Sequence, residues 1–179
     1  ASLIHDAEEG IKRYKGTLSP GNLSALFFNC ALICFGDRNY KQAKHWIERL
    51  LNETESTQKE ELHSAARIMN VIIQLEEGKD DLLDHSVRSV YRYLLKREKL
   101  YRSEKALLDL IRKRIPRTTG KEEMLNTLRT FRTELLELSS DPLETVFLET
   151  FDVLSWLEGK IEGRPFAEAV KSKLRITSI

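Results

Sequence analysis

The feature that most constrains this chain is a regular spacing of glycines between apolar segments. Gly36, Gly78, Gly120 and Gly163 are separated by 42, 42 and 43 residues. Each glycine follows one segment with helical apolar periodicity and precedes another, so each period holds a pair of helices. A fixed period above about 20 residues is typical of stacked structural units. The spacing therefore predicts a series of helical hairpins.

Helices account for almost the whole sequence in this interpretation. Apolar residues recur at intervals of three and four, and strict two-residue alternation is almost absent. Asp141 and Pro142 form a capping carboxylate and a first-turn proline, which together mark one helix start. We predict an all-α fold of about nine helices, at residues 2–15, 21–36, 40–52, 58–77, 80–98, 101–115, 121–139, 142–159 and 165–175.

Composition limits the classes of partner and the cellular locations that we expect for the chain. The 29 basic and 28 acidic residues leave a net charge of +1, so overall charge favours no class of partner. Cys30 and Cys34 are the two cysteines and lie four apart in an apolar run, which favours buried, reduced thiols and a cytoplasmic location. No apolar stretch reaches the roughly 18 to 20 residues that span a bilayer, so we expect no membrane segment.

One segment, residues 26–52, carries large and small residues on two predicted helices joined by a turn. These residues are Phe27, Ala31, Tyr40, Ala43, Ile47 and Leu50. The segment resembles a tetratricopeptide repeat, a helix-turn-helix unit. It departs from that family at Cys30, where leucine is usual, at Arg38, where the family has glycine, and in a period of about 41 residues instead of 34.

The resemblance implies a right-handed superhelical stack of antiparallel helix pairs. It implies a single tetratricopeptide-like domain over residues 1–179, similar to divergent helical-repeat regions of bacterial proteins. Residues 2–12 align with the second helix of a repeat and carry a stripe formed by Leu3, Ile4, Ala7 and Ile11. We therefore expect the chain to be the C-terminal part of a longer array.

Catalytic chemistry has no evident signature in the sequence. The four histidines lie on four different predicted helices, and none has the spacing of a zinc-binding helix. No nucleophile elbow and no phosphate-binding loop is present. We expect no enzyme activity, and no catalytic, cofactor-binding or metal-binding residues.

The family resemblance implies that the first helix of each pair lines a concave surface that binds extended peptides. The candidate partner-binding residues at such positions are Phe28, Asn29, Leu32, Phe35, Arg67 and Asn70. Asn29 and Asn70 suit this role because an amide both donates and accepts hydrogen bonds. The alternative, equally weighted, is that Phe28, Leu32 and Phe35 are buried against a neighbouring repeat.

A basic stretch at residues 88–121 has 12 basic and three acidic residues. Arg88, Arg92 and Lys96 step by four along one predicted helix, with Tyr91 and Tyr93 interleaved, a pattern that can meet phosphates or an acidic partner. The alternative is internal pairing with the acidic residues between 76 and 84 or between 134 and 162. The pI of about 8.0 lies below the basicity typical of nucleic-acid-binding domains and favours pairing.

These observations favour a non-catalytic scaffold that binds a peptide segment or a helical surface of another protein. The alternatives are a nucleic-acid-binding helical repeat that uses the basic stretch and a peptide-sensing regulatory domain. The sequence specifies neither the partner protein nor the oligomeric state.

Overall fold

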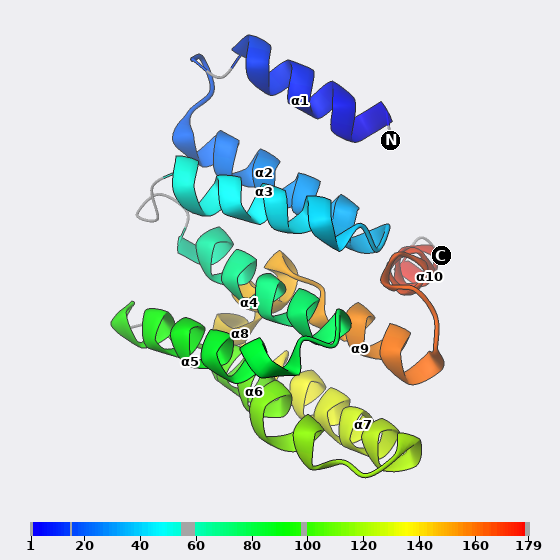
Figure 1. Ribbon diagram of the computed structural model, residues 1–179. Coiled ribbons are helices and arrows are strands. Elements are labelled where there is room, and N and C mark those ends of the chain that lie inside the picture. Colours follow the sequence, from blue (N-terminus) through cyan, green and yellow to red (C-terminus); the bar gives the residue numbers. More distant parts are fainter. Residues whose placement is uncertain (1, 15, 55–59, 98–99, 178–179) are drawn as a thin grey trace. The chain divides into compact units, whose positions relative to one another are not determined.

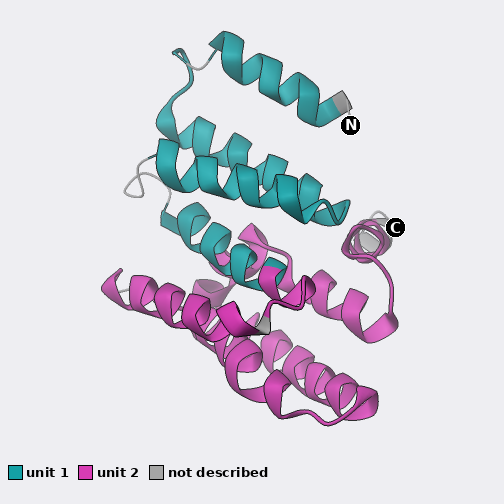
Figure 2. Cartoon of the chain, viewed as in Figure 1, with its two compact units in different colours: residues 1–73 teal, residues 74–179 magenta. Residues whose placement is uncertain are grey.

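The computed structural model describes residues 2–14, 16–54, 60–97 and 100–177 (Figure 1). The all-α prediction is confirmed for these residues, which contain no strand and form ten α-helices rather than about nine. The chain divides into two compact units, residues 1–73 and 74–179, and the boundary lies within helix α4 (Figure 2). No described helix combines the length and apolar character that a bilayer crossing requires.

Unit 1 is built on a helical hairpin. Its helices are α1 (Ser2–Tyr14), α2 (Pro20–Gly36), α3 (Tyr40–Glu53) and the larger part of α4 (Glu60–Glu76). Helix α1 contacts α2, and α2 packs along α3. At the centre of the hairpin, the rings of Phe27 and Trp46 lie 5.9 Å apart, and the Arg49 guanidinium lies over both rings at 4.5 and 4.9 Å. Ala31 and Ala43 are fully buried, so small side chains let the two helices approach closely.

The turn between α2 and α3 uses a left-handed residue that is not glycine. Arg38 has φ of 57°, and the following amide of Asn39 donates to the carbonyl of Cys34 at 2.8 Å. Asn39 then caps α3, because its side-chain oxygen accepts from the amide of Gln42 at 3.2 Å. Arg38 therefore occupies the backbone conformation for which glycine is the usual choice.

Unit 2 contains the end of α4 and the remaining helices of the chain. These are α5 (Asp80–Lys96), α6 (Arg102–Asp109), the π-helix η2 (Leu110–Arg114), the 3₁₀-helix η3 (Ile115–Arg117), α7 (Lys121–Leu138), α8 (Pro142–Thr150), α9 (Val153–Glu162) and α10 (Phe166–Thr177). Helix α6 contacts α5, α7 and α8, while α9 contacts α7 and α10. Leu107, Phe131, Phe151 and Leu157 are fully buried within this unit.

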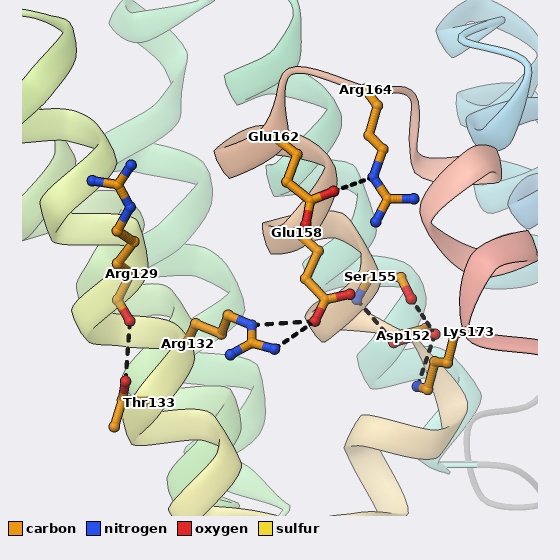
Figure 3. A network of polar contacts seen from close by, with 9 residues as sticks. All are labelled: Arg129, Arg132, Thr133, Asp152, Ser155, Glu158, Glu162, Arg164 and Lys173. Atoms are coloured by element: carbon orange, nitrogen blue, oxygen red, sulfur yellow. Dashed lines mark hydrogen bonds and ion pairs between the residues drawn. The ribbon is translucent and has the colours of Figure 1, made fainter. Parts of the chain in front are cut away.

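The predicted single helix at 142–159 is wrong, because the chain breaks it into α8 and α9 (Figure 1), and Figure 3 shows the side chains of Asp152, Ser155 and Lys173 at the break. Phe151 adopts extended backbone angles, and Asp152 starts a new helix. The Asp152 carboxylate accepts from the Ser155 amide at 3.0 Å and the Ser155 hydroxyl at 2.7 Å, and Lys173 of α10 donates to it at 3.1 Å. These bonds replace the helical bonds lost at the break.

The four regularly spaced glycines all lie at helix boundaries, but in different conformations. Gly78 and Gly163 follow α4 and α9 with φ of 66° and 70°. Gly120, with φ of 95°, instead precedes α7, and Gly36 is the last residue of α2. Only the glycines with positive φ need the freedom that a missing side chain provides.

Candidate functional site

The predicted groove residues of α2 separate into buried and accessible positions. Phe28 and Phe35 are each only 2% exposed, so a partner does not reach them in this conformation. Leu32 is half-buried and Asn29 is exposed. The burial that the sequence analysis weighed as an alternative therefore describes the two phenylalanines, and the groove expectation retains Asn29 and Leu32.

The accessible side of α2 forms a narrow stripe, which we name the α2 stripe and which consists of Ala25, Leu26, Asn29, Leu32 and Ile33. These positions recur at intervals of three and four and therefore share one face of the helix. Ile33 is 36% exposed and the other apolar members are half-buried. Asn29 lies between them as the single hydrogen-bonding side chain of the stripe.

Arg67 and Asn70 lie on the accessible side of α4, which is buried around most of its circumference. Both residues are half-buried, whereas Ala66, Ile68 and Met69 are fully buried. No hydrogen bond joins the side chains of Asn29 and Asn70 in the described part of the chain. Both asparagines are at least partly accessible, but no direct contact joins them into one site.

The two cysteines are buried in unit 1. Burial raises the pKa of the Cys30 thiol to about 11, and the neighbouring Cys34 adds to this shift. Burial likewise raises the pKa of Cys34. A thiol with a raised pKa carries little thiolate at neutral pH and is a poor nucleophile and metal ligand.

The basic stretch pairs in part with acidic side chains, some of them in the flanking ranges that the pairing alternative named and two of them, Glu104 and Asp109, inside the stretch. Six of the 11 basic residues that the structure describes in the stretch form ion pairs within unit 2. The pairs are Arg88 and Arg112 with Asp84, Arg97 with Glu104, Arg102 with Asp141 and Glu144, Lys113 with Asp109, and Arg114 with Glu134. Lys99 lies outside the described residues.

Part of the stretch also forms a surface hollow, which we name the α5 hollow. It has a volume of about 580 Å³ and is lined by His85, Arg88, Tyr91, Arg92 and Arg112. The structure thus joins two of the three predicted basic residues, Arg88 and Arg92, to an arginine from η2. Lys96 does not line the hollow and lies one helical turn beyond Arg92.

A proline accounts for the irregular backbone around Arg112. Pro116 has no amide proton, and its ring would clash with the carbonyl of Arg112 in a regular α-helix. The chain widens before it, so that the amide of Ile115 donates to the carbonyl of Leu110 in a π-helical turn. The predicted continuous helix at 101–115 is therefore wrong after Asp109.

Asp84 organises the two arginines that border it. Its Oδ1 lies 2.8 Å from Nε of Arg112, and its Oδ2 lies 2.8 Å from Nε of Arg88. The hydrogen bond from Arg112 and the positive charges of both guanidinium groups lower the pKa of Asp84. Asp84 therefore stays ionised and holds one arginine on each oxygen.

Sequence analysis did not join His85 or Arg112 to the stripe that Arg88 and Arg92 form. His85 and Tyr91 lie on the same helix as the predicted arginines, and their spacing of three residues on either side of Arg88 was a signal present in the sequence. Arg112 follows 20 residues after Arg92, across a loop and a π-helical turn, and no local pattern places it there. No group of three or more histidine, cysteine, aspartate or glutamate side chains in the described residues is arranged to hold a metal ion.

Comparisons with known proteins identify no relative of this chain. No protein-family model matches the sequence, and neither a curated protein nor a solved structure matches it significantly.

Proposed function

We propose that the chain is a non-catalytic scaffold that binds an extended segment of a partner protein. In this proposal its hairpins are divergent tetratricopeptide-like units that stack as a right-handed superhelix, as the resemblance of residues 26–52 suggests. The α2/α3 hairpin supports the likeness, since its large and small residues pack at the spacing of that family.

The observation that carries the proposal is the α2 stripe. Helix α2 is apolar around its whole circumference, yet one face remains accessible and has an asparagine at its centre. A carboxamide can accept from one backbone amide of an extended peptide and donate to a carbonyl of the same peptide. The apolar side chains around Asn29 then cover the alternating side chains of that peptide.

Site-specific crosslinking tests this proposal, because it captures a partner whose identity is not specified in advance. A photoreactive amino acid replaces Ile33 of the α2 stripe in one variant, which leaves Asn29 in place, and Glu48 in a control, because Glu48 is exposed on α3. We expect position 33 to capture a defined segment of one partner protein in the source cell, with the segment identified by mass spectrometry. Position 48 should not capture that segment.

The captured segment is then synthesised and titrated against the purified chain. Asn29→Leu keeps the branched shape of the side chain and removes both hydrogen bonds, so we expect binding to weaken by roughly tenfold. Equal capture at both positions, or equal affinity of the Asn29→Leu variant, contradicts the proposed peptide-binding face.

A further inference from the structure

We propose that the α5 hollow is a second binding site and takes an acidic segment of a partner protein that also carries an apolar side chain. The proposal rests on the proposed scaffold function for the nature of the partner. It is independent of the α2 stripe, because the hollow lies in unit 2 and the stripe lies in unit 1.

The arrangement around Asp84 leaves the outer ends of two arginines accessible. Both Arg88 and Arg112 contact Asp84 through Nε. No described residue accepts a hydrogen bond from the terminal nitrogens of either guanidinium. Since a guanidinium presents five donors in a rigid fork, each arginine retains its Nη groups for a carboxylate while Asp84 fixes its orientation.

The hollow keeps an excess of positive charge after this pairing. Three guanidinium groups line the hollow, and the Asp84 carboxylate pairs with two of them, Arg88 and Arg112. Arg92 has no acidic partner among the described residues, and the same is true of Lys96 one turn further along the helix. From Arg88 in the hollow to Lys96 just beyond it, the helix rises about 12 Å, which corresponds to roughly four residues of an extended peptide. A short acidic run in a partner fits this length.

Apolar surface accompanies the charges. Tyr91 lines the hollow, and Leu95 follows one helical turn later with 55% of its surface exposed. An exposed leucine beside a tyrosine gains stability when an apolar side chain of a ligand covers it. The ligand chemistry is therefore acidic and apolar together.

Nucleic acid fits this surface less well than an acidic peptide. Six of the 11 described basic residues of the stretch already pair with acidic side chains, so few cations are left to neutralise successive phosphates. The apolar element at Leu95 also has no counterpart in a sugar-phosphate backbone.

Fluorescence anisotropy with synthetic peptides tests the proposal. The probe is a labelled peptide of about ten residues that contains a run of glutamates and two leucines, measured at about 0.15 M salt. One comparison peptide has glutamine in place of glutamate, another has serine in place of leucine, and a single-stranded oligonucleotide of similar length is the third probe. We expect the parent peptide to bind best, and both replacements to weaken binding.

Variants assign the binding to the hollow. Arg92→Glu removes one attraction and adds one repulsion, so it should weaken binding of the parent peptide by roughly tenfold. Leu95→Ser should weaken binding of the parent peptide but not that of the serine peptide. Arg117→Glu is the matched control, because Arg117 is exposed in unit 2 and lies outside the hollow, and it should change the affinity little. Circular dichroism and thermal unfolding establish that each variant is folded.

Three results overturn the proposal: equal affinity for the glutamate and glutamine peptides, an Arg92→Glu affinity equal to that of the parent chain, or tighter binding of the oligonucleotide. Its failure is distinguishable from failure of the scaffold function. Specific capture at position 33 together with unchanged peptide binding in Arg92→Glu leaves the scaffold in place and removes the hollow. An Arg92-dependent affinity for the acidic peptide without any specific capture leaves the hollow in place and removes the α2 stripe as a binding site.

Discussion

The start of helix α6 depends on a carboxylate that comes from α8. Glu144 is only 4% exposed, and its Oε2 accepts from the Ser103 amide at 2.8 Å and from the Ser103 hydroxyl at 2.7 Å. Its Oε1 accepts from the Arg102 amide at 2.9 Å and from Arg102 Nε at 3.3 Å. One side chain therefore satisfies two of the four amides that a helix start leaves without partners.

These four bonds determine how much stability the chain should lose when Glu144 is replaced. A hydrogen bond to a charged group contributes about 1.5–3 kcal/mol, and the attraction between a carboxylate and a helix N-terminus contributes less than that. Glu144→Gln removes the charge and one acceptor, and we expect the free energy of unfolding to fall by about 2 kcal/mol. Glu144→Ala leaves both amides and the hydroxyl without their acceptor, and we expect a loss of about 4 kcal/mol.

The effect depends on pH with a defined sign. Burial alone raises the pKa of Glu144, but its hydrogen bonds with Ser103 and Arg102 outweigh burial, and the net pKa is lowered. A glutamate with a lowered folded-state pKa stabilises the fold fully above its unfolded pKa of about 4.3. This contribution disappears as pH falls through the lowered folded-state value. The difference between wild type and Glu144→Gln should therefore shrink in acid.

Urea unfolding followed by circular dichroism at neutral and acidic pH measures these differences. Glu149→Gln is the matched control, because Glu149 is an exposed glutamate of the same helix, and we expect a change below about 0.5 kcal/mol. A double-mutant cycle with Ser103→Ala isolates the contact between the two helices. A Glu144→Gln variant as stable as wild type at neutral pH would refute the reasoning.

Three further predictions concern other buried groups. Cys30 and Cys34 should react slowly with a thiol reagent in the folded chain and rapidly in denaturant, since burial raises both pKa values, and rapid labelling of the native chain contradicts this. Burial and then a neighbouring guanidinium lower the pKa of His63, so stability should decline as pH falls below about 6.5 through the lowered folded-state value. His63→Gln should flatten that part of the profile, and an unchanged pH slope of unfolding counts against this role. Gly159→Ala should destabilise the chain by about 2 kcal/mol, because its Cβ would lie 2.8 Å from a backbone carbonyl of the loop before α10. The same change at Gly10, a helical glycine with open space, should leave stability equal or higher, and equal melting temperatures of the two variants exclude the steric explanation.

Helix boundaries written in adjacent residues were predictable from the sequence. Asp141 and Pro142 start α8 as expected, and the Asp141 carboxylate accepts from the Leu143 amide at 3.0 Å. Glu144, in the same first turn, was predictable only as a favourable charge near the helix start. Its bonds to Arg102 and Ser103 join positions about 40 residues apart, so they follow from tertiary packing and not from local pattern.

The sequence did not predict which of the expected groove residues on α2 are buried and which are accessible. Helix α2 is apolar around its circumference, so periodicity carries little information on which face is covered. Phe28 and Phe35, seven residues apart, share one face, as helical geometry requires, and both are buried. Asn29 was the more informative residue, because a polar side chain in an apolar helix is stable where water or a ligand reaches it.

In the α5 hollow, a backbone irregularity determines the position of one candidate residue, which the sequence pattern therefore did not predict. Arg88 and Arg92 follow from α-helical spacing, but Arg112 reaches the same hollow through a π-helical turn. A regular helix up to Pro116 would rotate each residue about 100° from the one before it, whereas a wider turn rotates each residue less. The direction of Arg112 thus depends on where the helix widens. Pro116 predicts that a regular α-helix is interrupted nearby, but it does not predict whether the helix widens or ends there.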